Sequence, residues 1–345
     1  MAHIDDQNVL YIFDQTILPG AKATINFNMA KLYTTTNVDV PIIIERSKVP
    51  GPTVLITGGI HGDEVNGVEI VRQLISKGIN KPKIGTIICV PVLNVFGFLN
   101  MNREFPDGRD LNRVFPGFKN GSLASRLAYQ FTKNILPVAN YCLDFHTGGA
   151  SRFNAPQIRV KKGDAEALDF AKVFNAPFTM YSKTIPKSYR ETCGKLNIPI
   201  LLFEGGKSQD NDKTIAKYGV DGSMRILNHL GNMSFEYMWS QGMLDDKFSV
   251  PDVNAPTVII DSSTWIRAKY SGLLHTKIEC GKHVEKGEYI ATITDPYGQF
   301  RHKVKTNNEG YIINVNQSPM VYQGDAIFHI STSSQSNEEA EGEDN

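Results

Sequence analysis

The sequence predicts an α/β fold in which helices cover both faces of a mixed, mostly parallel central sheet, followed by a small C-terminal all-β domain. Over the first two-thirds of the 345 residues, short β-branched runs alternate with longer segments whose apolar residues recur every three or four positions. From about Ala255 this helical spacing is lost, and short apolar runs alternate with Gly, Pro and Asn turns. We therefore expect two domains, 1–254 and 255–332, and a tail at 333–345.

The first domain is expected to alternate strands with helices. Its β-branched runs predict strands at 40–47, 53–59, 85–93, 141–147 and 198–206. Apolar residues at helical spacing predict helices over 64–78, 122–139 and 165–175. In open α/β sheets ligands bind beyond the carboxyl ends of the strands, so these strand ends are where a functional site is expected.

The C-terminal domain contains two similar halves. Segments 271–293 and 309–330 each carry a Gly before an apolar pair and, further on, a VxxG or VxQG turn. This arrangement resembles the biotinyl/lipoyl-type barrel-sandwich domain, which predicts a small β-sandwich with internal pseudo-symmetry. The turn TDPYGQFRHKV lacks the Met-Lys-Met in which that family carries its modified lysine. A swinging-arm role is therefore not expected.

Charge and hydropathy exclude several classes of partner. Lys plus Arg and Asp plus Glu are 36 each, so the chain has no net attraction to nucleic acid or to an anionic membrane. Acidic residues stand where a signal peptide needs a positive region, and no run reaches about 18 apolar residues. We expect a cytoplasmic protein with reduced cysteines, and a disordered tail because 333–345 is acidic and lacks large apolar side chains.

A candidate metal site lies at two of the predicted strand ends. His61 and Glu64 stand in the loop GGIHGDE after one strand, and His146 stands in the polar end of the strand YCLDFHT. Imidazole nitrogen and carboxylate oxygen are both good Zn²⁺ donors. An HxxE pair alone is more often a loop histidine with a helix-capping acid, but the third donor favours a metal. Two histidines and one carboxylate leave a position open for water, which is typical of catalytic zinc.

Two further segments carry groups suited to catalysis. The Pro- and Gly-rich segment NREFPDGRDLNRVFPG is rich in hydrogen-bond donors: Arg103, Arg109, Asn112 and Arg113. Arginine binds carboxylates bidentately, so the segment predicts a clamp for an acidic substrate, the alternative being a solvated basic loop. Glu204 ends the strand IPILLFEGG. A carboxylate there is either a general base for metal-bound water or a helix cap or salt-bridge partner.

In their order along the chain, GGxHGDE, DLNRxFPG, DxHTGG and a strand-end Glu followed by Gly resemble one family. This is the succinylglutamate desuccinylase/aspartoacylase family of zinc-carboxypeptidase-like hydrolases. The resemblance runs from about Val54 to Gly206, and a trailing β domain is usual in the family. It implies a zinc-carboxypeptidase-like fold and one Zn²⁺ per chain, held by His61, Glu64 and His146.

The resemblance also implies roles for the residues around the metal. Glu204 matches the carboxylate that activates water in the family. Arg103 matches the arginine that polarises the scissile carbonyl, with Arg109 as its alternative. Asp110 matches the acid that orients the first histidine, here His61.

The resemblance implies that the substrate's carboxylate is bound by Asn112, Arg113 and, as a weaker match, Arg190. It implies a hydrolase that removes an acyl group from an N-acyl amino acid or related small N-acyl amine, by Glu-assisted attack of metal-bound water. A metallocarboxypeptidase acting on peptides and a non-catalytic metal-binding protein remain as alternatives. The expected partner is the small-molecule substrate, with no nucleic acid and no membrane, and a homo-oligomer is compatible with the sequence.

Overall fold

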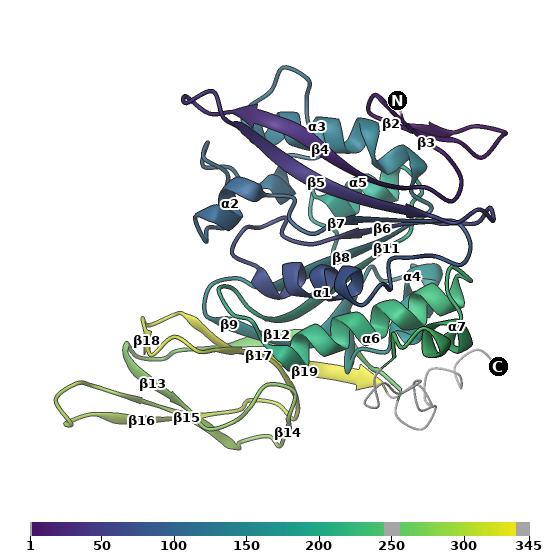
Figure 1. The fold of residues 1–345 in the computed structure, drawn as a ribbon. Coiled ribbons are helices and arrows are strands. Elements are labelled where there is room, and N and C mark those ends of the chain that lie inside the picture. Colours follow the sequence, from purple (N-terminus) through teal and green to yellow (C-terminus); the bar gives the residue numbers. More distant parts are fainter. Residues whose placement is uncertain (1, 245–255, 336–345) are drawn as a thin grey trace.

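The computed structural model describes residues 2–244 and 256–335, and most of its strands join one 12-stranded sheet (Figure 1). In spatial order the sheet contains β14 (His283–Val284), β17 (Gly310–Asn316), β19 (Ala326–Gln335), β12 (Val258–Arg267), β10 (Phe178–Tyr181), β9 (Arg152–Val160), β11 (Ile200–Lys207), β8 (Tyr141–Gly148), β6 (Thr53–Thr57), β7 (Thr86–Val90), β5 (Asn37–Arg46) and β4 (Lys22–Lys31). The five strands predicted for the first domain are confirmed as β5, β6, β7, β8 and β11.

Parallel pairing is confined to the middle of the sheet. β6 pairs in parallel with β7 and β8, β8 with β11, and β10 with β9 and β12. The flanks are antiparallel, as is the β9–β11 pair. The prediction of a mixed sheet is confirmed. Among the central-sheet strands of residues 2–244, four of the seven pairings are parallel, and the strands of the C-terminal region add mainly antiparallel ones. The alternation of strands and helices in a sequence predicts parallel strands joined through a helix. β4 and β5 are instead joined by a short turn, which permits antiparallel pairing without a helix.

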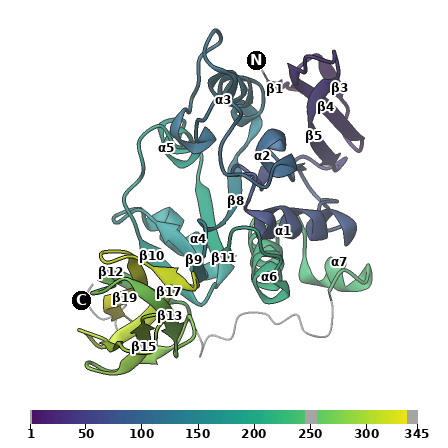
Figure 2. The same cartoon turned by 90° about the vertical axis from the view of Figure 1, so that its left-hand side faces the viewer.

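Helices cover both faces of the sheet, as predicted. They are α1 (Val65–Ser76), α2 (Val95–Leu99), α3 (Leu123–Asn134), α4 (Ala165–Phe174), α5 (Tyr189–Lys195), α6 (Lys213–His229) and α7 (Phe235–Ser240), with 3-10 turns η1 (Leu111–Arg113) and η2 (Leu136–Val138). α1, α4 and α6 pack on one face, while α3 and α5 pack on the other (Figure 2). The helix predicted over 122–139 divides into α3 and η2 because Pro137 cannot continue an α-helix.

The sequence pattern does not predict α6, because two glycines interrupt it. A Cβ at Gly219 would lie 2.3 Å from Ile70 of α1, and one at Gly222 would lie 2.3 Å from the ring of Phe174 of α4. Glycine at both positions lets α6 pack closely against the two neighbouring helices. This packing holds a helix whose glycines lower its intrinsic propensity by about 1 kcal/mol each.

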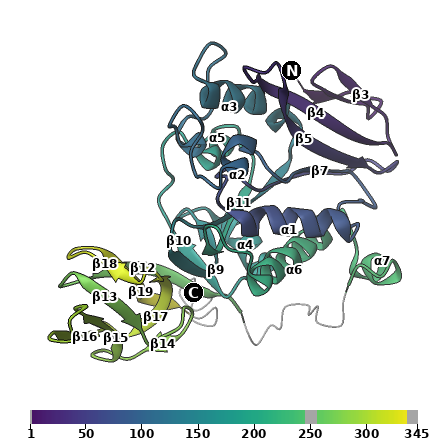
Figure 3. The same ribbon diagram turned by 60° about the vertical axis from the view of Figure 1, so that its left-hand side comes forward.

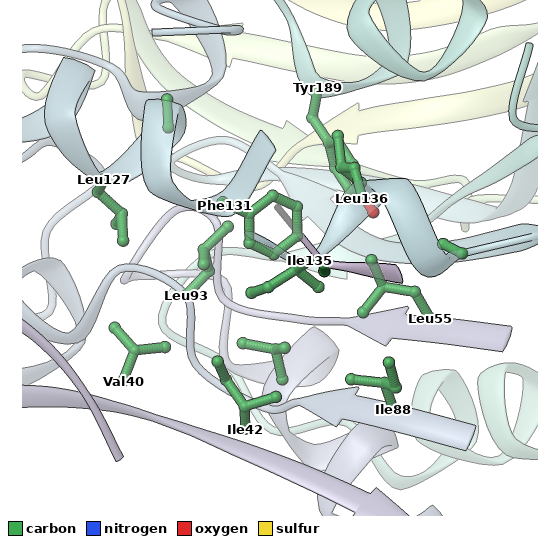
Figure 4. Close-up of a cluster of buried hydrophobic side chains, with 14 of the residues drawn as sticks. Val40, Ile42, Leu55, Ile88, Leu93, Leu127, Phe131, Ile135, Leu136 and Tyr189 are labelled. Atoms are coloured by element: carbon green, nitrogen blue, oxygen red, sulfur yellow. The ribbon is translucent and has the colours of Figure 1, made fainter. Parts of the chain in front are cut away.

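Each face of the sheet has its own hydrophobic core. Successive residues of β6 point to opposite faces, so Leu55 packs beneath α3 and α5 while Val54 and Ile56 pack beneath α1 and α6. On the α3 side, Leu55 joins a buried cluster that includes Phe131 and Tyr189 (Figure 4). Burial on both faces explains why the middle strands are continuous apolar runs.

The C-terminal region is all-β, as predicted, and part of it belongs to the central sheet. β13 (Gly272–Thr276), β15 (Tyr289–Thr294), β16 (Arg301–Lys305) and β18 (Met320–Val321) form a separate four-stranded sheet that projects from the end of the molecule (Figure 3). β12 pairs with β10, and β17 pairs with β9. Two strands of the C-terminal region, β12 and β17, are therefore hydrogen-bonded to strands of the N-terminal part of the chain.

The remaining predictions on chain organisation are only partly within the described residues. The predicted boundary at 254/255 lies outside them, and the division into domains stays a prediction. β19 continues to Gln335, so the first residues of the predicted tail are strand, and 336–345 lie outside the described part. A small N-terminal sheet contains β1 (His3–Ile4), β2 (Leu10–Ile12) and β3 (Gln15–Ile17). Among the described helices, none has the length and hydropathy needed to cross a bilayer.

Candidate metal centre and active site

The three predicted metal ligands lie together at the carboxyl ends of β6 and β8. His61 and Glu64 occupy the loop between β6 and α1, and His146 lies in β8, the parallel neighbour of β6. Glu64 Oε1 lies 2.6 Å from His61 Nδ1, and Glu64 Oε2 lies 2.9 Å from His146 Nδ1. One ligand atom from each of the three lies within 4.8 Å of the others, and all three side chains are buried.

A carboxylate on the far side of each ring orients the two histidines. His61 Nε2 lies 3.0 Å from Asp110 Oδ1, and His146 Nε2 lies 2.8 Å from Asp144 Oδ2. Thr57 holds Asp144 in turn, donating its hydroxyl to Oδ1 at 2.7 Å. Such carboxylates turn the Nδ1 atoms towards a common point and raise ligand basicity. Sequence reasoning missed Asp144, although its place two residues before His146 on one face of a strand was a usable signal.

The electrostatics of this cluster suit a divalent cation. Burial by itself raises the pKa of the Glu64 carboxyl, yet His61 and His146 hold it well below its usual range. Burial lowers the pKa of His146, but Asp144 and Glu64 outweigh it and raise that pKa well above its ordinary value. Glu64 therefore stays ionised between two imidazoles whose other nitrogens are already paired. Two imidazole nitrogens and one carboxylate oxygen, buried and convergent, fit Zn²⁺ or a similar transition metal.

A cavity of about 640 Å³ opens over the three candidate ligands. Its wall comes from both parts of the chain. Trp265, Asn314 and Asn316 of the C-terminal region face residues of the first domain across it. Its positively charged wall residues are Arg103, Arg113, Arg152, Arg159, Lys183 and Arg190, whereas its carboxylates are Glu64 and Glu204. The wall therefore has an excess of positive charge, as expected for an anionic ligand.

Arg103 and Arg109, the two alternatives for the catalytic arginine, have different surroundings. The Arg103 guanidinium donates to Asp110 Oδ2 at 2.9 Å and to Glu64 Oε1 at 3.3 Å, so it lies beside the candidate ligands. Arg109 does not line the cavity. Its side chain is 53% exposed and lies 3.5 Å from Asp107. A turn in which Phe105 N donates to the Arg109 carbonyl separates the two arginines.

The predicted carboxylate clamp is assembled from two elements. Asn112 of η1 accepts a hydrogen bond from Tyr189 N at 2.8 Å, which ties η1 to the start of α5 and brings Arg113 and Arg190 to one cavity. Burial, and then the neighbouring Arg159, lower the pKa of Arg190 to about 10. Arg190 is half-buried and donates from Nη1 to the Ser182 hydroxyl at 2.9 Å. Among the ion pairs found for the described residues, none involves Arg190.

Glu204 lies next to His146, because the two are register partners on β11 and β8. Its Oε2 accepts a hydrogen bond from Asn154 Nδ2 at 2.8 Å, and its Oε1 lies 3.4 Å from Arg159 Nε. Sequence reasoning missed Asn154 and Arg159. Both lie on β9, a strand that was not predicted, and neither residue carries a motif signal.

Comparison with known proteins identifies the family. Residues 50–230, more than half of the chain, match the succinylglutamate desuccinylase/aspartoacylase catalytic domain. The chain belongs to this family. A curated relative from Halomonas elongata, N-alpha-acetyl-L-2,4-diaminobutyric acid deacetylase, is 30% identical over 276 residues, which are 75% of this chain and 75% of that protein.

Several solved structures share this fold, among them a succinylglutamate desuccinylase/aspartoacylase. The protein from Rhodobacter sphaeroides has a TM-score of 0.76 at 23% identity, covering 92% of this chain and 96% of that one. The product-bound ectoine utilization protein EutE (DoeB) from Ruegeria pomeroyi has a TM-score of 0.74 at 22% identity, covering 91% and 95%. Coverage of this extent includes most of the C-terminal β region, so the shared fold extends beyond the catalytic domain.

Exchanging the two alternative arginines separately tests which of them acts at the metal centre. For the role that the family resemblance implies for Arg103, Arg103→Ala is expected to lower kcat about 100-fold, since removal of one preorganised donor to a developing oxyanion costs that much. Arg109→Ala is expected to leave kcat and KM unchanged within about twofold, because an exposed ion pair outside the cavity contributes little. Steady-state kinetics of both variants decide the question, and the opposite pattern would return Arg109 to the catalytic role.

Proposed function

We propose that this protein is a zinc-dependent deacylase that hydrolyses the amide bond of small N-acyl amino acids, releasing a carboxylic acid and a free amino compound. The observation that carries the proposal is the buried His61–Glu64–His146 donor set at the floor of a cavity whose wall also presents Glu204 and several arginines. Family membership supports amide hydrolysis, and the Halomonas relative is named for an N-acetylated amino acid.

In this proposal His61, Glu64 and His146 hold one Zn²⁺ per chain, in a zinc-carboxypeptidase-like arrangement. A metal held there supplies Lewis acidity, which activates water and polarises a carbonyl oxygen. Asp110 and Asp144 keep the two imidazoles oriented towards it.

Two residues of the chain carry out the chemistry. Glu204 accepts a proton from the attacking water and returns it to the nitrogen of the departing amine. Arg103 donates hydrogen bonds to the substrate oxygen that gains negative charge as the water adds. No covalent intermediate with the protein is needed, because water is the nucleophile.

Asn112, Arg113 and Arg190 bind the carboxylate of the amino acid in this proposal. The cavity volume of about 640 Å³ is in the usual range for small-molecule sites. Trp265 and Asn314 of the C-terminal region form part of the wall, which favours a small substrate over the extended peptide of a metallocarboxypeptidase. A non-catalytic metal-binding protein would have no use for Glu204 and Arg103 beside the donor set.

A substrate screen with and without a chelator tests the proposed function. N-acetyl, N-formyl and N-succinyl amino acids are incubated with the full chain, and the released amine is quantified. Cleavage of one acyl class is expected, together with its loss on chelation and its return with added Zn²⁺. Release of C-terminal residues from peptides instead would establish the carboxypeptidase, and metal binding without any cleavage would establish the non-catalytic alternative.

A further inference from the structure

A chain of buried amide side chains leads from the C-terminal region to Glu204. Asn314 on β17 donates from Nδ2 to Asn154 Oδ1 at 2.7 Å, and Asn154 on β9 donates from Nδ2 to Glu204 Oε2 at 2.8 Å. Asn314 is 3% exposed and Asn154 is 4% exposed. Both side chains line the cavity over the metal ligands. They therefore join the candidate base to a part of the chain outside the catalytic domain.

The backbone places these three residues close together on three adjacent strands, β17, β9 and β11. Asn314 and Asn154 are register partners in the antiparallel β17–β9 pair. On its other side, β9 pairs with β11, where Asn154 is opposite Gly206, two residues after Glu204. The hydrogen bond between Asn314 and Asn154 depends on β17 pairing with β9, so it forms only when the C-terminal region is joined to the central sheet.

The chain of hydrogen bonds has a single workable direction. The Glu204 carboxylate only accepts, so Asn154 has to present its nitrogen to it. The Asn154 oxygen then faces β17 and needs a donor there, which Asn314 Nδ2 supplies. If the Asn154 amide turned over, its oxygen would lie against the carboxylate. Arg159 attracts the other carboxylate oxygen at 3.4 Å, but it does not contact the Asn154 amide and does not set its orientation.

Burying the Asn314 side chain lowers the stability of the fold through its oxygen, while its amide nitrogen donates to Asn154. The Asn314 Oδ1 is buried and has no hydrogen-bond partner among the described residues. Burying an acceptor without a hydrogen-bond partner destabilises the folded protein. An apolar side chain of similar size would fill the position without that cost, but it would leave the Asn154 oxygen unpaired.

We propose that Asn314 and Asn154 are positioning residues that hold the Glu204 carboxylate in its catalytic orientation, so that the C-terminal β region completes the active site. The inference rests on the proposed function of Glu204 as the base. In a buried site a hydrogen bond is stronger than in water, and a carboxylate that is free to rotate spends less time aligned with the attacking water.

The test compares four variants of the full chain with the wild type. Asn314→Asp keeps the shape but removes the donor, and Asn314→Ala removes the side chain without adding a charge. Asn154→Ala breaks the next bond, and a double variant combines it with Asn314→Ala. The matched control is Asn232→Asp, at a fully buried amide that donates to Pro52 O at 2.9 Å and Ile84 O at 3.0 Å.

A positioning role predicts a fall in kcat of about tenfold in both Asn314 variants and in Asn154→Ala, with KM unchanged within about twofold. The double variant is expected to match Asn154→Ala, because both changes remove one chain of contacts. Zinc content is expected to stay at the wild-type level in all four. Asn232→Asp is expected to lower the melting temperature while kcat stays unchanged.

Three results would overturn the proposal: Asn314 variants with wild-type kcat, a double variant whose losses multiply, or an Asn232→Asp variant whose kcat falls as far as that of Asn314→Asp. The last would show that lost stability alone explains the effect. Failure of the proposed function looks different, because the wild type itself would then release no amine from N-acyl amino acids.

Discussion

Glu204→Gln is expected to lower kcat by about 1000-fold, within the range for loss of a general acid–base group. Glutamine has the shape of glutamate and still accepts the Asn154 hydrogen bond, but it takes no proton from water. Because Glu204 is outside the donor set, the variant is expected to keep its zinc. Turnover is measured by released amine, and metal content by elemental analysis of the purified protein.

The matched control for this change is Glu69→Gln. Glu69 pairs with Arg72 on the exposed side of α1 and does not line the cavity over the metal ligands. Its variant is expected to turn over at the wild-type rate. Near-wild-type activity of Glu204→Gln would remove Glu204 from the mechanism, and loss of zinc from that variant would make Glu204 a ligand instead of a base.

Glu64→Ala is expected to abolish zinc binding and activity together. The Glu64 side chain is 1% exposed and lies against both imidazoles, while its Oε2 also accepts from Thr147 N at 3.2 Å. Its removal takes away the only carboxylate of the donor set and leaves two imidazoles, which by themselves bind a divalent cation far more weakly. The purified variant is expected to carry almost no zinc.

Thermal unfolding with and without added zinc provides a second measurement. A ligand at 100 times its dissociation constant stabilises the native state by about 2.7 kcal/mol, so zinc is expected to raise the wild-type melting temperature and to leave that of Glu64→Ala unchanged. Asp110→Asn is a control with a smaller expected effect. Its zinc affinity is expected to fall about 10–100-fold, so that the site fills again at a higher zinc concentration. Stoichiometric zinc in purified Glu64→Ala would contradict the assignment of the metal site.

The sequence by itself determined the elements and residues whose signal is local. β6, β7 and β8 are continuous apolar runs because both faces of the sheet are covered. Such runs can be recognised in the sequence without knowledge of tertiary contacts. His61, Glu64 and His146 follow these strands, and parallel strands bring their carboxyl ends to one edge. The strand pattern therefore placed the donors at one edge, whereas the structure shows that β6 and β8 are neighbours there.

Only the tertiary structure decided which groups surround the donors. The β17–β9 pairing joins Asn314 to Asn154 across 160 positions of the chain, and no periodicity within either segment records it. The sequence favoured Arg103 by resemblance but left Arg109 as its alternative, and the structure places Arg103 beside Glu64 and leaves Arg109 half exposed. Contacts of this kind depend on which strands pair and in what register, which are set by packing over the whole fold. Patterns of two and 3.6 residues determine only which face of an element is buried.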